Sequence, residues 1–97
     1  MEYVVFVHKN TKENTTAEEW SRFFDRARES GMFKGGYGFG VNYTVGNLEI
    51  SDITETLSGM MRFDAEDFDP LFELLRSHPV VVKGGSLSMC EVPKTFS

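Results

Sequence analysis

The spacing of hydrophobic and polar positions changes along the chain, and each change predicts a secondary-structure element. Residues 2–8 are almost continuously β-branched or aromatic, a pattern typical of a strand that is buried on both faces. The next apolar positions recur every three or four residues and predict an amphipathic helix; they are Trp20, Phe23, Phe24 and Ala27. Thr16 and Glu19 have the spacing of a capping box at the start of this helix, and Gly31 lies where a left-handed helix end is expected.

The second half of the chain shows the same two periodicities. Residues 41–45 alternate apolar with polar side chains, and residues 56–63 also favour a strand. A second amphipathic helix is predicted by apolar residues at helical spacing, namely Phe68, Leu71, Phe72 and Leu75. This helix is expected to end at Ser77 or His78, because the proline that follows disfavours helical backbone in the residue before it. Residues 86–92 predict the last strand.

In order, these elements are strand, helix, strand, strand, helix, strand, and they fit one domain over residues 1–97. This βαββαβ order is typical of the ferredoxin-like α+β fold, in which two helices cover one face of an antiparallel sheet. Because the first strand is apolar on both faces, and because Met60 and Phe63 add apolar area in the third strand, we expect the other face to be buried in a homodimer, a dimeric α+β barrel. A monomer with a hydrated sheet face is the alternative.

Composition narrows the classes of partner. The chain has 97 residues and a formal net charge of −5, and its ten Lys and Arg residues are scattered, which argues against a nucleic-acid partner. The opening MEYVVFVHKN has an acidic second residue and a short apolar run, so we expect neither a signal peptide nor a membrane span. The single cysteine, Cys90, cannot form an intramolecular disulfide. These features predict a cytoplasmic protein.

Four of the nine glycines lie in the segment Lys34–Gly40, KGGYGFG. Neither of the common phosphate-loop spacings is present, and the segment is expected to follow a helix and lead into a strand, the reverse of a phosphate-binding loop. We therefore interpret it as a helix end that feeds a glycine-rich strand. The missing side chains are expected to clear space for a ligand cleft, and its candidate lining residues are Tyr37, Phe39, His8 and Met60.

The candidates for acid–base or nucleophilic chemistry are two histidines, one aspartate and one cysteine. His8 ends the first strand, where a cleft is expected, whereas His78 precedes a proline and is expected to be a structural helix end whose cationic form the helix dipole favours. Asp52 lies close to two isoleucines, an arrangement that can raise the pKa of a carboxyl group, with a solvated loop acid as the alternative. Cys90 is expected to be a buried, unreactive thiol. No spacing predicts a metal site, and no motif predicts a cofactor.

A recognisable pattern is spread over nearly the whole chain: Met1–Val7, Trp20 and Phe24 followed by Gly31–Gly36, Ser58–Asp67, and His78–Val80 followed by Gly84–Leu87. Together they resemble the YCII-related family, which includes the DGPF-type proteins. The resemblance implies a ferredoxin-like fold that dimerises into an α+β barrel. It also implies a cleft aspartate, which Asp52 matches, and for some members a histidine on the first helix. This chain has no histidine in that helix, so only Asp52 carries over.

Three functions are compatible with these features. We favour a homodimeric module that binds an apolar or aromatic small molecule in a cleft lined by aromatic and methionine side chains. The first alternative is an enzyme of the dimeric α+β barrel type, in which Asp52 acts as general acid or base with His8 as its partner. The second alternative is a dimeric interaction protein that binds no ligand.

Overall fold

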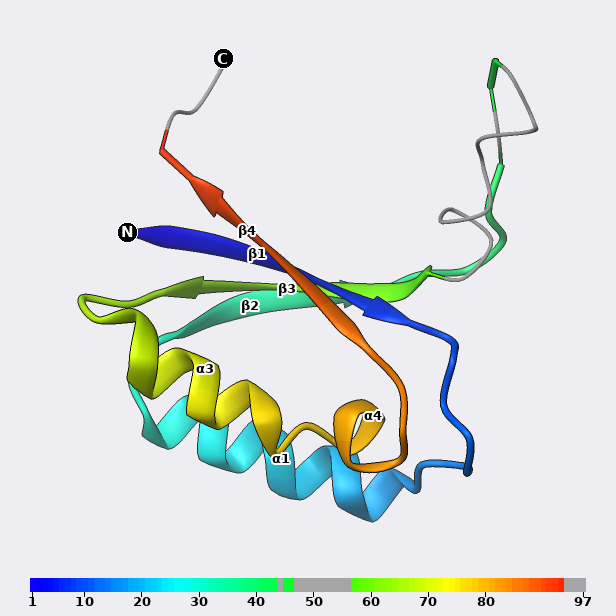
Figure 1. Cartoon of the computed structure of the whole chain (residues 1–97), viewed down its shortest axis with the longest axis horizontal. Helices are drawn as coiled ribbons and strands as arrows, with labels where there is room; N and C mark the ends of the chain where they lie inside the picture. The colour runs from blue at the N-terminus through cyan, green and yellow to red at the C-terminus, as the bar shows by residue number, and fades with distance from the viewer. Residues whose placement is uncertain (44, 47–56, 94–97) are drawn as a thin grey trace.

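The computed structural model describes residues 1–43, 45–46 and 57–93, and the elements in this part of the chain follow the expected order, with one short helix before the last strand that the sequence did not predict (Figure 1). The strands are β1 (Glu2–His8), β2 (Phe33–Gly38), β3 (Leu57–Asp64) and β4 (Leu87–Val92). The helices are α1 (Ala17–Glu29), α3 (Phe68–Arg76) and the short α4 (Pro79–Val82). None of these helices has the length and apolar content needed to cross a membrane.

The four strands form one antiparallel sheet in the order β2–β3–β1–β4. All three helices lie on one side of this sheet, and no described element covers the opposite side, which we call the open face (Figure 1). The chain therefore has the ferredoxin-like α+β fold that its βαββαβ order predicts.

Local sequence explains where α1 begins and ends. Thr16 Oγ1 accepts a hydrogen bond from the Glu19 N–H at 3.1 Å, and the Glu19 carboxylate accepts one from the Thr16 N–H at 2.9 Å. This capping box, as expected, satisfies N–H groups that a helix start leaves without partners. After the last turn, Gly31 adopts a φ of 77°, a left-handed conformation that glycine takes with little strain.

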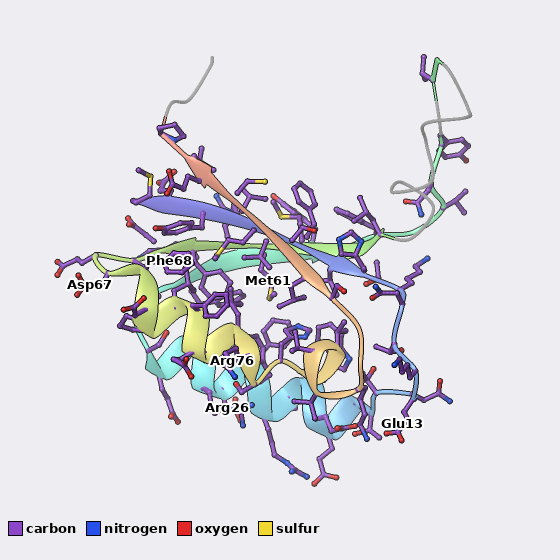
Figure 2. The ribbon with its side chains drawn as sticks, viewed as in Figure 1. Glu13, Arg26, Met61, Asp67, Phe68 and Arg76 are labelled. Carbon is purple, nitrogen blue, oxygen red and sulfur yellow. The ribbon has the colours of Figure 1, made fainter. Side chains whose placement is uncertain are left out.

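The core lies between the sheet and the helices, where alternate residues of each strand point. The side chains of β1 that face the helices are at most 6% exposed; they are Tyr3, Val5 and Val7. Met61 occupies the same layer (Figure 2), and so does Phe63, which is 1% exposed and does not add to the open face as the sequence suggested. Met60 pairs with Phe6, and both lie on the open face, where they are only partly buried.

The second strand lies earlier in the chain than the alternation at residues 41–45 predicts. β2 begins at Phe33, directly after the helix exit, because the Phe33 ring packs against Phe63 of β3 with 5.4 Å between the ring centroids. In contrast, the Val41 and Tyr43 side chains are 80% and 83% exposed. No described layer covers these apolar side chains, so the alternation does not produce a strand in the described part of this segment.

His78 is buried and neutral, contrary to the cationic helix end that the sequence suggested. It starts α4, and its Nδ1 accepts a hydrogen bond from the Val80 N–H at 3.1 Å, while Nε2 has no partner among the described residues. Its ring packs against Trp20 and Phe23, with centroid distances of 4.6 and 4.5 Å. Burial lowers the pKa of His78 from 6.5 to about 4. A helix end stabilises a cation by only about 0.3–1 kcal/mol, which is less than this loss of hydration.

Acid is predicted to destabilise the fold through His78. As the pH falls from 6.5 towards about 4, the unfolded chain binds a proton on this histidine while the folded chain does not, so protonation favours unfolding. This linkage should remove about 3 kcal/mol from the free energy of unfolding over that range. His78→Asn keeps a side-chain acceptor at the helix start and should flatten the pH dependence, measured by urea unfolding.

Val80→Ala is the control for this experiment, because it truncates a neighbouring core side chain without removing a titrating group. It should lower the stability at every pH and keep the wild-type slope. A His78→Asn variant with the wild-type slope would refute the role of this histidine.

Candidate functional site

A cleft of about 470 Å³ opens between α1 and the β2–β3 edge of the sheet, and we call it the α1–β2 cleft. Aromatic residues line it from α1 and β2, namely Trp20, Phe24, Phe33 and Tyr37. Glycines line it from the two strands, namely Gly35, Gly36, Gly38 and Gly59. Arg28 is the one charged residue in this described lining. The volume is within the usual range for small-molecule sites in proteins.

The helix side of the cleft is a row of side chains spaced four residues apart. Trp20, Phe24 and Arg28 share one face of α1, because four residues make slightly more than one helical turn. The Trp20 and Phe24 rings stack with their centroids 5.9 Å apart, and the Phe24 ring lies 5.6 Å from that of Phe33 on β2. The Arg28 guanidinium lies 5.8 Å from the centre of the Phe24 ring. The row is therefore aromatic along its length and cationic at one end.

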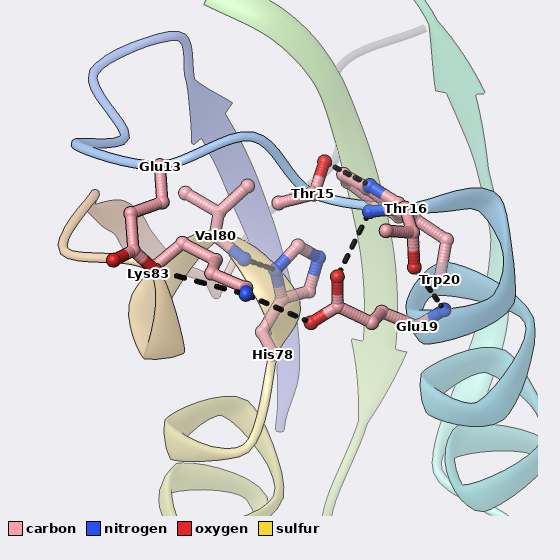
Figure 3. A network of polar contacts seen from close by, with 8 residues as sticks. All are labelled: Glu13, Thr15, Thr16, Glu19, Trp20, His78, Val80 and Lys83. Atoms are coloured by element: carbon pink, nitrogen blue, oxygen red, sulfur yellow. Dashed lines mark hydrogen bonds and ion pairs between the residues drawn. The ribbon is translucent and has the colours of Figure 1, made fainter.

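Contacts at the start of α1 hold Trp20 in place (Figure 3). The indole Nε1 donates a hydrogen bond to Thr15 Oγ1 at 2.9 Å, and the ring also packs edge to face with the buried His78. Lys83, which follows α4, places its Nζ 3.7 Å from the carboxylate of Glu19 in the capping box. These contacts join α4 to the first turn of α1 and fix the ring at one end of the cleft.

The sheet side of the cleft lacks side chains where β2 and β3 approach each other closely. Gly38 and Gly59 are directly paired in the antiparallel register. A Cβ atom on Gly59 would lie 2.7 Å from the Tyr37 carbonyl oxygen, and one on Gly36 would collide with the Met60 carbonyl oxygen. Gly38, in contrast, has open space where its Cβ would be. The strand pairing thus requires glycine at two of these positions, and the cleft remains unfilled as a result.

Two of the sequence-predicted cleft residues, Tyr37 and Met60, border the α1–β2 cleft, although their register with Phe6 places their side chains on the open face of the sheet. Phe39 lies just beyond the end of β2 and is not part of the lining, although its N–H donates a hydrogen bond to the Ser58 carbonyl at 2.9 Å. The glycine-rich segment therefore borders a cleft within one chain, between α1 and the sheet edge, and its aromatic side chains are a minor part of the site.

The polar candidates lie elsewhere. His8 is outside the α1–β2 cleft, and its Nε2 lies 2.7 Å from the Ser88 hydroxyl oxygen. Asp52 lies outside the described residues, so the Asp52–His8 pair stays a prediction. Cys90 is exposed, which corrects the expected buried thiol; it pairs with Val4 on the open face of the edge strand β4. Among the described residues, no group of three or more His, Cys, Asp or Glu side chains is placed to hold a metal ion.

The apolar helix face that the sequence predicts includes Trp20 and Phe24 but not Arg28. A signal was nevertheless present, because Trp20, Phe24 and Arg28 recur at a spacing of four, beside the separate buried pair Phe23 and Ala27. When a row of aromatic residues on a helix face ends in an arginine, the rest of the protein typically covers that face only in part.

No protein-family model matches this chain, and no curated protein matches it in sequence. Among solved structures, it is similar to 5-chloro-2-hydroxyhydroquinone dehydrochlorinase from Burkholderia phenoliruptrix, solved in complex with 2,5-dihydroxybenzoquinone. The match has a TM-score of 0.50 and a sequence identity of 10%, and it covers 94% of this chain and 92% of the other. At this identity the likeness supports the fold alone.

Alanine at the paired glycines Gly59 and Gly38 is predicted to affect stability very differently. Gly59→Ala should destabilise the protein by about 1–3 kcal/mol, because the added methyl group meets a carbonyl oxygen that cannot move without distorting the pairing of β2 and β3. Gly38→Ala should be neutral to within about 1 kcal/mol, because its methyl group enters open space. Chemical denaturation measures both values, and equal losses would contradict the close strand approach at Gly59.

Proposed function

We propose that this protein is a homodimeric binding module that holds a flat, largely apolar small molecule in the α1–β2 cleft. The observation that carries the proposal is the combination of an aromatic row on the helix side with a glycine floor on the sheet side. Aromatic side chains attract ring ligands through offset and edge contacts, which contribute about 0.5–1.5 kcal/mol each beyond the burial of apolar area. The glycines leave the space that such a ring needs.

Apolar burial supplies most of the expected affinity. Removal of apolar surface from water contributes about 25 cal/mol per Å², so a ligand that buries about 200 Å² gains on the order of 5 kcal/mol. The loss of translational and rotational freedom on association opposes this gain. The ring contacts add to it, so we expect dissociation constants in the micromolar to millimolar range.

An enzyme that uses Asp52 and His8 stays the alternative. The described lining of the α1–β2 cleft contains no carboxylate and no imidazole, and its charged group is Arg28. These groups support binding and orientation better than proton transfer. A ligand-free interaction protein, the third hypothesis, differs from both because it would bind no probe in the cleft.

The structurally similar dehydrochlorinase was solved with a small ring compound, 2,5-dihydroxybenzoquinone. A single ring of that size fits easily within a cleft of about 470 Å³. For this chain, however, the proposed ligand class rests on the residues of its own cleft, because a sequence identity of 10% carries no binding residue from one protein to the other.

The open face of the sheet supports the proposed dimer. Tyr37, Met60 and Phe6 occupy adjacent register positions and form a row across β2, β3 and β1, and Val4 lies beside it on β1. A second copy that packs its open face against this row would remove the apolar side chains from water. A twofold axis makes such a face complementary to itself.

Filling the cleft is predicted to weaken binding of a neutral aromatic probe, N-phenyl-1-naphthylamine, whose fluorescence rises in apolar surroundings. Gly38→Leu places its side chain in the open space of the cleft and should weaken binding at least about tenfold. Gly40→Leu is the matched control, because its Cβ also meets no atom but Gly40 does not line the cleft. A wild-type protein that does not bind the probe, or equal binding by the two variants, would rule out the cleft as the site.

The dimer is predicted to depend on the open face. Sedimentation analysis should give the mass of two chains for the wild type and of one chain for Phe6→Asp, because a buried carboxylate without a partner opposes association. Val82→Asp is the control, since Val82 is 64% exposed and belongs to the helix layer. A monomeric wild type at micromolar concentration would contradict the dimer.

A further inference from the structure

Arg28 places a single positive charge in the otherwise uncharged described lining of the α1–β2 cleft. In the part of the chain that the structure describes, its ion-pair partner is Asp25, with 3.5 Å between Nη1 and Oδ1. Both side chains are about two-thirds exposed, at 64% and 67%. Exposed pairs of this kind contribute little to stability, so a ligand anion can replace this contact at small cost.

The position of Arg28 gives the cleft two different ends. Trp20 lies in the first half of α1, whereas Arg28 lies in its last turn. The chain reverses after α1, so Phe33 at the start of β2 is near the Arg28 end. Ser58 lies at the start of β3, which is paired with the far end of β2, and its Oγ donates a hydrogen bond to the Val7 carbonyl at 3.2 Å. The cleft therefore has the cationic Arg28 at one end. At the other end is the Ser58 hydroxyl group, whose oxygen can still accept a hydrogen bond.

We propose that the α1–β2 cleft selects aromatic compounds that carry one anionic group, such as a carboxylate or sulfonate, with the anion against Arg28 and the ring against Phe24 and Phe33. This inference rests on the proposed binding function and adds the charge of the ligand to it. A guanidinium presents a planar fork of N–H donors that matches the paired oxygens of such an anion. A neutral ring would gain only the apolar part of the interaction.

Apart from the Asp25 carboxylate, two effects oppose an anion at this position, and neither outweighs the guanidinium. The formal net charge of −5 repels anions, but salt screens this repulsion over about 8–10 Å. The carbonyl end of α1 carries a partial negative charge. There, however, the N–H groups of Ser30 and Gly31 already bond the carbonyls of Arg26 and Arg28. A charge-assisted hydrogen bond in direct contact then favours the anionic ligand by about tenfold.

The test compares two fluorescent probes that share one carbon framework. 8-Anilinonaphthalene-1-sulfonate carries an anionic group, whereas N-phenyl-1-naphthylamine lacks it. Wild type, Arg28→Leu, Arg28→Lys and Arg22→Leu are each titrated with both probes, and circular dichroism confirms that each variant is folded. Arg22 is the matched control, because it lies on the same helix, is 62% exposed, pairs with Glu18 at 2.8 Å and does not line the cleft.

Arg28→Leu should weaken binding of the sulfonate probe about tenfold and leave binding of the neutral probe within about twofold of the wild type. Arg28→Lys should keep most of the affinity for the sulfonate probe, and Arg22→Leu should bind both probes as the wild type does. Equal effects of Arg28→Leu on the two probes, or an equal loss of the sulfonate probe in Arg22→Leu, would overturn the role of Arg28. The proposed function is tested separately. It is refuted if the neutral probe does not bind the wild type, or if Gly38→Leu does not weaken binding of that probe.

Discussion

The close approach of β2 and β3 is the constraint on which the candidate site depends. Carbonyl oxygens occupy the positions where Cβ atoms of Gly36 and Gly59 would lie, so neither strand can carry a side chain there. The helix above nevertheless presents two kinds of face. Phe23 and Ala27 are fully buried against the core, while the row that begins at Trp20 meets the bare edge of the sheet. One helix thus completes the core on one side and forms the wall of a cleft on the other.

The buried histidine supports the wall of the cleft near the start of α1. His78 satisfies an N–H group at the start of α4 with one ring nitrogen and packs its ring against Trp20, which is also a cleft residue. The salt link from Lys83 to Glu19 joins the same two helices at the surface. The wall of the cleft is therefore held by a neutral aromatic contact inside and by charges outside. These two kinds of interaction respond differently to salt and to acid.

The sequence predicts the fold well because its strongest signals are local. The capping box at Thr16, the left-handed Gly31 and the apolar first strand each determine an element without reference to the rest of the chain. The second strand was predicted in the wrong place. Alternation of apolar and polar residues at 41–45 indicates strand propensity, but it does not show whether another layer of the protein covers the apolar side chains. The βαββαβ order and the helix layer follow from the sequence, whereas the pairing that begins at Phe33 depends on contact with Phe63.

The candidate site was less predictable because it depends on where side chains are missing. Glycines in KGGYGFG indicated free space, but their sequence does not reveal that α1 supplies the opposite wall. Arg28 has the appearance of an ordinary surface charge until the helix is docked on the sheet. His78 likewise suggested a cation at a helix end, and only its enclosure by two aromatic rings makes the neutral form favourable.

The order of strands in the sheet also has a consequence for how the chain folds. β1 is central, yet both strands that pair with it come from the second half of the chain, and its pairing with β4 joins Glu2 to Val92. Contacts between such distant residues make folding slow relative to folds built from local contacts. During synthesis, the first strand cannot form all its backbone hydrogen bonds until the last strand has been made. The apolar residues of the first strand therefore stay exposed in the nascent chain until the later strands are made, and such exposed surface is prone to aggregation.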